Sequence, residues 1–231
     1  MRLVFQNSKD MTITPVAYFH SPFGSKFGIP RQSGIVEEVE GEIHFVEEYQ
    51  NAEAIRGLED FEYLWLIWGF SANAHEANGV TVRPPRLGGN KRMGVFATRS
   101  PFRPNPLGLS SVKLKKVEFI ERNCPVLTVL GADLMDGTPI YDIKPYIVYA
   151  DCHPEARSGF VDSRSWPKLE VVIPEEIAKN YQPERLSVLR KILELDPRPH
   201  YQNDPHRIYG MPFDGTDVRF FVENGVLTVI R

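Results

Sequence analysis

The ten residues from Phe61 to Phe70, with the sequence FEYLWLIWGF, form the most apolar segment of this chain and contain five aromatic side chains. A short continuous apolar run is typical of a strand that is buried on both faces. We therefore expect this segment to lie at the centre of a sheet or barrel. No stretch of the chain approaches the ~18 consecutive apolar residues of a membrane span, so no membrane association is expected.

Further strand patterns surround the Phe61–Phe70 segment. They are rich in β-branched and aromatic residues and are separated by turn residues, with one short helix expected at residues 51–58. An extra lysine interrupts the alternation after Leu114, which predicts a bulge in the longest strand. The expected strands cover residues 12–19, 41–46, 93–98, 107–120, 126–131 and 140–149. Strands at this spacing predict a closed or nearly closed antiparallel β-barrel.

The pattern changes after about residue 155. Leucine and isoleucine recur at nearly helical spacing from Pro183 to Leu195, and the helix should stop before Asp196-Pro197-Arg198-Pro199. An Asn224-Gly225 turn between two apolar runs predicts a hairpin. The chain is therefore predicted to be mainly β, with a barrel domain over residues 1–155 and a small α+β domain over residues 156–231. Residues 1–10 are expected to be a loose extension.

Positive charge is concentrated in one segment. The chain has 27 Lys and Arg against 30 Asp and Glu, yet Ala77 to Val117 contains nine of the basic residues and no acidic residue. The prolines in this segment favour a defined shape, and fixed cations on an ordered loop suit a polyanion or a phosphate-bearing ligand. A basic surface loop without a partner is the alternative. The candidate cations are Arg83, Arg86, Lys91, Arg92, Arg99 and Arg103.

Several classes of protein are disfavoured. The six histidines are scattered without ligand spacing, so no metal is expected. The only cysteines, Cys124 and Cys152, form no regular framework, which fits a reducing cytoplasm. The N-terminal residues lack the apolar core of a signal peptide. Dinucleotide-binding and P-loop signatures are absent.

Two other loops carry polar residues of chemical interest. Pro30-Arg31-Gln32 combines a fixed turn with a cation and an amide, although an ordinary turn explains the same residues. The stretch 131–146 contains three aspartates followed by Lys144 and Tyr146, and these side chains could converge on one cleft. A plain β-turn at Asp136 is the alternative.

Three stretches together resemble one family. PRQ at 30–32, RPPRLGGNKRMGVFATRSPFRPNPLG at 83–108 and DLMDGTPIYDIKPY at 133–146 are similar to those of the TsaA-like, TrmO-type tRNA N6-threonylcarbamoyladenosine methyltransferases. The similarity covers nearly the whole chain. It implies a barrel methyltransferase domain, a small C-terminal domain and a homodimer. It also implies S-adenosylmethionine as the methyl donor, and as the acceptor N6 of threonylcarbamoyladenosine (adenine 37), beside the anticodon in the anticodon arm of tRNA.

The resemblance also implies roles for particular residues. The donor-binding positions carried over from the family are Pro30, Arg31, Gln32, Ser71, Ala72, Arg99, Leu109, Leu130, Gly131, Ala132 and Asp133. The residues expected to hold tRNA phosphates or stack a base are Arg83, Arg86, Lys91, Arg92, Arg103, Arg198 and Tyr201.

The chemistry of methyl transfer suggests a further set of residues. The acceptor nitrogen is a poor nucleophile, so a base should remove its proton during or before transfer. We expect Asp136 to be this base, with Lys144 or Tyr146 polarising the carbamoyl oxygen. Two other functions stay open: a non-catalytic RNA-binding module, and a methyltransferase for a small molecule whose carboxylate the arginines hold.

Overall fold

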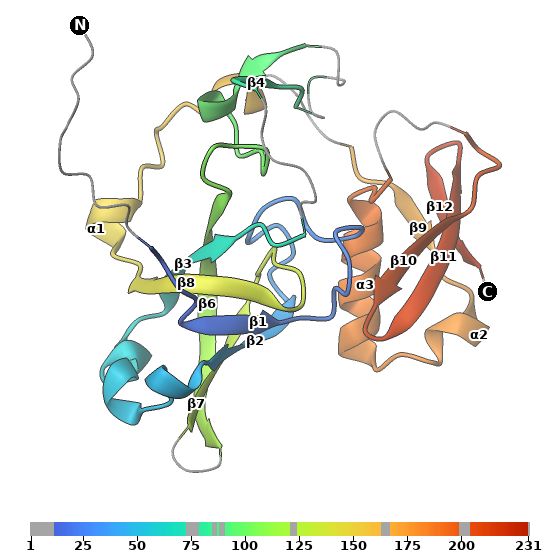
Figure 1. The fold of residues 1–231 in the computed structure, drawn as a ribbon. Coiled ribbons are helices and arrows are strands. Elements are labelled where there is room, and N and C mark those ends of the chain that lie inside the picture. The colour runs from blue at the N-terminus through green and yellow to red at the C-terminus, as the bar shows by residue number, and fades with distance from the viewer. Residues whose placement is uncertain are drawn as a thin grey trace, which may run out of the picture.

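The computed structural model describes residues 12–72, 79–84, 87, 91–120, 124–162, 167–198 and 204–230. A β-barrel and a separate C-terminal sheet lie side by side, and helix α3 (Pro183–Glu194) lies between them (Figure 1). This arrangement confirms the expectation of a mainly β chain with an antiparallel barrel followed by a small α+β part.

The barrel is closed by antiparallel strands in the order β1-β2-β7-β6-β3-β8. Alternate side chains of each strand fill the interior, as period-two patterning requires. Phe19, Ile43, Leu64, Leu127 and Ile140 are fully buried there. The barrel strands are β1 (Ala17–His20), β2 (Glu40–Phe45), β3 (Tyr63–Gly69), β6 (Leu107–Ile120), β7 (Cys124–Leu130) and β8 (Thr138–Pro145).

Strand β3 is the apolar segment singled out in the sequence, but only one of its faces is fully buried. Leu64, Leu66 and Trp68 point into the barrel, whereas Tyr63 on the outer face is 41% exposed. The outer face also carries Trp65, which packs against Tyr146 with ring centroids 5.6 Å apart. The prediction of burial on both faces is therefore wrong for the outer face.

Strand β6 contains the predicted bulge. Its pairing with β7 shifts register between Leu114 and Lys116, so Lys115 is the extra residue. At the other end of β6, Gly108 leaves room for the indole of Trp68, since a Cβ there would lie 2.3 Å from Trp68 Cε2.

Other expected elements differ in detail. Two 3-10 turns, η2 (Ala52–Ile55) and η3 (Leu58–Asp60), replace the expected helix, because Gly57 between them has φ +82°. The expected strand at 93–98 reduces to β5 (Met93–Gly94), paired with β4 (Thr81–Val82), and a 3-10 turn η5 (Val95–Ala97). The strand expected to reach Tyr149 ends at Pro145. The remaining short elements are η1 (Glu47–Tyr49), α1 (Val148–Asp151) and η7 (Gly159–Val161).

The C-terminal unit, residues 167–230, is built on a sheet with the order β10-β11-β12-β9. Its turn at Asn224 and Gly225 has φ of +50° and +82°, which confirms the predicted hairpin. Strand β9 pairs with β12 in parallel. Besides α3, the elements are β9 (Glu170–Val172), α2 (Glu175–Ala178), β10 (Tyr209–Phe213), β11 (Thr216–Glu223) and β12 (Val226–Ile230).

The core of the C-terminal unit also contains residues from the N-terminal part of the chain. Phe23, Val36 and Val39, from the connection between β1 and β2, are buried in the same cluster as Leu189 and Phe220. The connection therefore packs on the C-terminal unit as well as on the barrel. Within the described part of the chain, no helix is long and apolar enough to cross a membrane.

Candidate functional site

One rim of the barrel gathers all three loops that the sequence singled out. Because the strands are antiparallel, the ends at His20, Gly69 and Leu130 lie at the same rim. The connections that start there are residues 21–39, 70–106 and 131–137. They contain the Pro30-Arg31-Gln32 turn, most of the basic segment and the aspartate loop. We call this end of the barrel the loop rim and residues 70–106 the basic arm.

Side chains from the three connections meet at the loop rim. Arg99 Nη1 of the basic arm donates a hydrogen bond to Gln32 Oε1. Asp133 interacts with Arg99 electrostatically and accepts a hydrogen bond from the backbone N–H of Ser33. The Ser110 hydroxyl, inside the barrel, donates to Asp133 Oδ1 at 2.5 Å. The polar group of Gln32, Ser33, Arg99, Ser110 and Asp133 is therefore one connected cluster, which we call the rim cluster.

Asp133 carries the one carboxylate of the rim cluster. Burial raises the pKa of Asp133 above its ordinary value, and the hydrogen bonds from Ser110 and Ser33 and the charge of Arg99 oppose this rise only in part. Ser110 in turn accepts a hydrogen bond from Trp68 Nε1 at 2.9 Å. The hydroxyl is thus oriented toward Asp133 from inside the barrel. A partly desolvated carboxylate of this kind gains from a ligand that donates hydrogen bonds or carries positive charge.

The backbone beside Asp133 approaches the 21–39 connection closely. Gly34 N–H donates to Gly131 O at 2.8 Å, and Gly131 N–H donates to Val39 O at 2.8 Å. Gly34 and Gly131 have φ of +78° and +77°, a region that favours glycine. Both glycines and Leu130 line an open cleft of about 810 Å³ between the barrel and α3.

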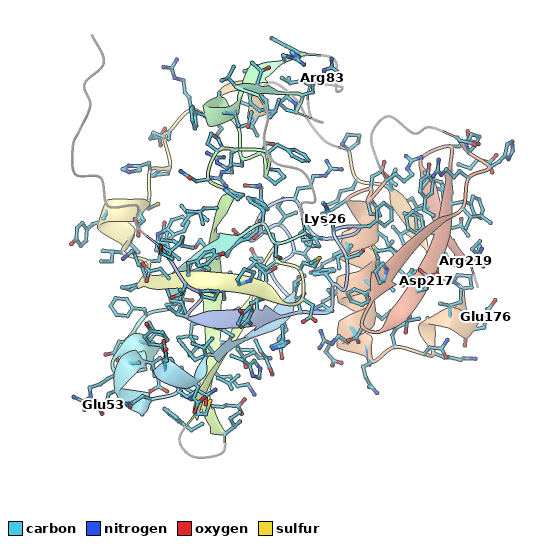
Figure 2. All side chains as sticks on the ribbon, in the orientation of Figure 1. Lys26, Glu53, Arg83, Glu176, Asp217 and Arg219 are labelled. Carbon is cyan, nitrogen blue, oxygen red and sulfur yellow. The ribbon has the colours of Figure 1, made fainter. Side chains whose placement is uncertain are left out.

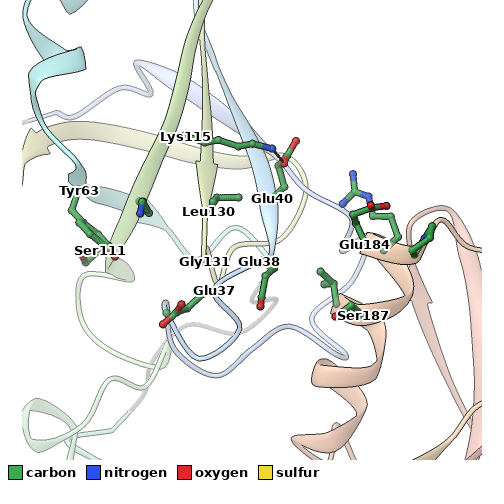
Figure 3. Close-up of a pocket in the computed structure, with 15 residues that line it drawn as sticks. Glu37, Glu38, Glu40, Tyr63, Ser111, Lys115, Leu130, Gly131, Glu184 and Ser187 are labelled. Atoms are coloured by element: carbon green, nitrogen blue, oxygen red, sulfur yellow. Dashed lines mark hydrogen bonds and ion pairs between the residues drawn. The ribbon is translucent and has the colours of Figure 1, made fainter.

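Figure 3 shows this cleft, with Glu184 and Ser187 of α3 facing Glu37, Glu38 and Glu40 from the barrel side. Its charges are mixed, because Lys115 pairs with Glu40 and Lys113 with Glu62 at 2.9 Å. Arg99, Gln32 and Asp133 do not line it. Two of the predicted donor-binding residues, Leu130 and Gly131, thus line this cleft, while the rim cluster lies beside it.

The remaining predicted donor-binding residues are spread along the loop rim. Pro30 and Ala132 are buried, and Leu109 is 56% exposed on the outer face of β6. Ser71 lines a second cleft of about 530 Å³ together with Asn105 and Tyr141. Ala72 follows Ser71 in the same turn.

The three predicted catalytic side chains do not share one cleft within a single chain. Asp136 lies at the loop rim, where it accepts a hydrogen bond from Ser21 N–H at 3.1 Å and contacts His20 Nδ1 at 3.2 Å. Lys144 and Tyr146 lie at the opposite rim, because β8 runs the length of the barrel and separates them from Asp136. A strand rises about 3.3 Å per residue, so Asp136 lies about 25 Å from Lys144 and Tyr146.

Lys144 and Tyr146 have local partners at the opposite rim. Lys144 Nζ pairs with Asp142 at 3.0 Å. Burial raises the pKa of Tyr146, and the neighbouring Cys152 and Asp151 raise it further. The Tyr146 ring also packs beside Tyr63 and Trp65.

The predicted RNA-binding cations fall into two groups. Arg83, Lys91 and Arg92 are exposed on the β4–β5 part of the basic arm, and Figure 2 shows Arg83 at its outer end. Arg92 Nη1 donates to Thr81 Oγ1 at 3.1 Å, and the half-buried Arg103 donates to Thr98 O at 3.1 Å. Arg86 and Tyr201 lie outside the described residues.

Arg198 differs from the exposed cations. Its guanidinium donates to both carboxylate oxygens of Asp196, from Nε and Nη2 at 2.8 Å each, and its side chain is only 13% exposed. The hydrogen bonds to Asp196 raise the pKa of Arg198. Its charge is therefore already paired within the chain.

Sequence reasoning missed Ser33, Ser110 and Trp68 as parts of the site. The alternation of β6, with Gly108, Ser110 and Val112 on one face, would have placed Ser110 inside the barrel. A polar residue between Gly108 and Val112 on the inward face is the only signal of its role. Among the described residues, no group of three or more His, Cys, Asp or Glu is arranged to hold a metal ion.

The fold and the loop rim define a class: a small antiparallel barrel that presents a ligand site on three loops at one rim, backed by an α+β unit. The model of the tRNA-methyltransferase O N-terminal domain matches residues 18–152, and that of the TrmO C-terminal domain matches residues 167–231. The chain belongs to the TrmO family.

Relatives and solved structures agree with this assignment. The chain is 42% identical over 193 residues to the tRNA (adenine(37)-N6)-methyltransferase of Escherichia coli K12, covering 81% of this chain and 82% of that protein. It is 36% identical to the putative S-adenosylmethionine-dependent methyltransferase RcsF of Pseudomonas aeruginosa PAO1, covering 90% and 91%. The crystal structure of TrmO from P. aeruginosa superposes with a TM-score of 0.75 at 29% identity, covering 95% and 96%.

Proposed function

We propose that this chain is an S-adenosylmethionine-dependent tRNA (adenine(37)-N6)-methyltransferase that acts on N6 of threonylcarbamoyladenosine beside the anticodon. The observation that carries the proposal is the meeting of three loops at one barrel rim, where the partly buried Asp133 carboxylate interacts with Arg99, which donates a hydrogen bond to Gln32. Family membership supports the reaction class. A tRNA substrate also implies that the protein works in the cytoplasm.

The residues at the loop rim fit the methyl donor chemically. S-adenosylmethionine carries a sulfonium, an amino group and a carboxylate, so its site needs acceptors as well as cations. Asp133 supplies an acceptor whose pKa is raised by burial, and Arg99 and Arg31 supply cations. The glycines at 34 and 131 allow close approach to the backbone. When bound, the donor supplies the electrophilic methyl group.

Asp136 is the base that this proposal retains. It is about half exposed at the loop rim and lies three residues after Asp133, so it can reach an acceptor nitrogen presented there. His20 and Ser21 fix its orientation. Lys144 and Tyr146 could act on the same acceptor only from a second copy of the chain, because β8 separates them from Asp136.

A homodimer is part of the proposal. The basic arm exposes large apolar side chains, with Val80 81% and Phe96 79% exposed. Large apolar side chains that are this exposed suit an interface with a second copy of the chain. The exposed cations Arg83, Lys91 and Arg92 on the same arm suit the phosphates of the tRNA anticodon arm.

The test of the function is mass spectrometry of nucleosides from tRNA incubated with the protein and donor. We expect threonylcarbamoyladenosine to gain one methyl group. Methylation of adenosine 37 in tRNA that lacks the threonylcarbamoyl group would assign a different acceptor. Absence of any methylated nucleoside, together with absence of donor binding in calorimetry, would favour the RNA-binding module.

The Asp136→Asn variant tests the base. The amide cannot accept the acceptor proton, so single-turnover methylation should slow by about 100-fold or more. Donor affinity should change less than threefold in calorimetry, because Asp136 is not in the rim cluster. A single-turnover rate equal to that of the unmodified protein would remove Asp136 from the mechanism.

A further inference from the structure

We propose that the turn formed by Asp196 and Arg198 in the C-terminal unit is a positioning device for Arg31, through which that unit sets the affinity for the methyl donor. The inference rests on the proposed function, because it assigns Arg31 to donor binding. It gives Arg198 a role other than the phosphate contact expected from the sequence.

A hydrogen bond links the Pro30-Arg31-Gln32 turn directly to the C-terminal unit. Arg31 Nη2 donates a hydrogen bond to the backbone oxygen of Asp196 at 3.1 Å, across 165 positions of sequence. This hydrogen bond orients a guanidinium whose neighbour, Gln32, contacts Arg99 of the rim cluster. The carbonyl of Asp196 therefore helps to determine where the cation of the Pro30-Arg31-Gln32 turn lies.

An unusual backbone conformation presents the carbonyl of Asp196. Asp196 has φ +53°, a left-handed conformation that is uncommon for residues other than glycine and persists only where its surroundings hold it. Arg198 supplies the hold, with two 2.8 Å hydrogen bonds from its side chain and one of 3.3 Å from its backbone N–H. A bidentate pair of this kind fixes geometry as well as charge.

The rest of the 21–39 connection is anchored on the C-terminal unit. Phe23, Val36 and Val39 are buried in the core of the C-terminal unit, and Lys191 of α3 pairs with Glu38. Gly28 lies against Met211, where a Cβ would meet the Met211 sulfur at 2.1 Å. Because both flanks of Pro30-Arg31-Gln32 are held, a change at Asp196 or Arg198 would act on a restrained loop and should move Arg31 specifically.

The experiment compares the affinity of the full chain for S-adenosylmethionine in calorimetry. Arg198→Ala should weaken donor binding about tenfold, the equivalent of about 1.4 kcal/mol. Arg198→Lys, which keeps the charge but not the bidentate geometry, should weaken it less. The control is Lys168→Ala, which removes a cation of the same unit that pairs with Glu194 at 3.2 Å, away from the Arg31 contact. It should leave the affinity unchanged.

Two further measurements separate positioning from a general structural role. The maximal methylation rate of Arg198→Ala at saturating donor and its affinity for tRNA should each stay within about twofold of the unmodified protein. The Arg31→Ala, Arg198→Ala double variant should bind the donor no more weakly than Arg31→Ala alone. Arg198 acts only through Arg31 in this inference, so its loss has no further effect once Arg31 is absent. If Arg198→Ala does not fold, Asp196→Gly serves instead, since glycine keeps the left-handed backbone while removing the carboxylate.

Unchanged donor affinity in Arg198→Ala with weaker, less salt-dependent tRNA binding would overturn the inference and identify Arg198 as a phosphate contact. Additive losses in the double variant would overturn it as well. Failure of the unmodified protein to bind the donor would instead overturn the proposed function.

Discussion

At the scale of single residues, Asp133 shows how the barrel creates an unusual side chain. Its carboxylate ends a relay in which Trp68 donates to Ser110 and Ser110 donates to Asp133. Burial still raises its pKa, so the charged form of Asp133 is held at a cost in the folded protein.

The difference in stability between an Asp133→Asn variant and the unmodified protein should therefore depend on pH in a defined direction. A carboxyl with a raised pKa contributes most to stability below the ordinary value of 3.8, and this contribution is lost as pH rises through the higher value in the folded state. At pH 7 the variant should melt higher than the unmodified protein, by on the order of 2 °C. The advantage should shrink as pH falls toward 4 in calorimetric melting. A variant that melts lower at pH 7 would contradict the role of burial.

Arg99 should behave in the opposite way, because it is exposed and contributes mainly to the ligand site. Arg99→Ala removes a hydrogen bond to Gln32 and a charge beside Asp133. Donor affinity should fall about tenfold in calorimetry, with less than about 1 kcal/mol lost from the free energy of unfolding. Arg92→Ala on the β4–β5 part of the arm is the control and should leave donor affinity unchanged. A large loss of stability at constant affinity would make Arg99 structural.

At the scale of elements, the tight fit inside the barrel depends on Gly108 in β6. A methyl group there would overlap Trp68, whose side chain is held by its hydrogen bond to Ser110. Gly108→Ala should lower the free energy of unfolding by about 1–3 kcal/mol and alter the tryptophan fluorescence. Gly94→Ala is a matched control, since φ is −56° and no heavy atom lies within 4 Å of the added Cβ. Equal stability of the two variants would show that Trp68 can move aside.

The elements that sequence predicted well are those with a local cause. The bulge at Lys115 follows from a break in alternation, the Asn224-Gly225 hairpin from a turn dipeptide, and the end of α3 from the prolines that follow it. The prediction of a strand at 93–98 is wrong beyond Gly94, because the 3-10 turn η5 follows there. Local patterns carry no information on how the basic arm folds back.

The candidate site was predictable where loops share a rim and unpredictable where a strand intervenes. Asp136 and Lys144 are close in sequence, yet the strand between them carries them to opposite ends of the barrel. Arg198 is a residue of the type that contacts phosphates, but its guanidinium is paired with the carboxylate of Asp196, two residues away. Ser110 gave almost no signal, because its role depends on the neighbours that barrel closure brings to it.

At the scale of the whole molecule, the exposed apolar side chains of the basic arm predict assembly. Phe96→Asp should convert the expected dimer to a monomer in size-exclusion chromatography with light scattering, because a buried charge disfavours association. Val148→Asp is the control, since Val148 is 71% exposed in α1 near the opposite rim. A monomer from Val148→Asp and a dimer from Phe96→Asp would move the interface to that rim.

The shared core between residues 21–39 and the C-terminal unit limits how this architecture can be rearranged. Phe23, Val36 and Val39 would each lose about 1.5–3 kcal/mol of burial if the final third of the chain were removed. Grafting a foreign C-terminal segment onto this barrel would then succeed only if the segment between the first two strands were exchanged along with it. A substitution in one of the two packed surfaces would therefore need a matching substitution in the other to keep the shared core filled.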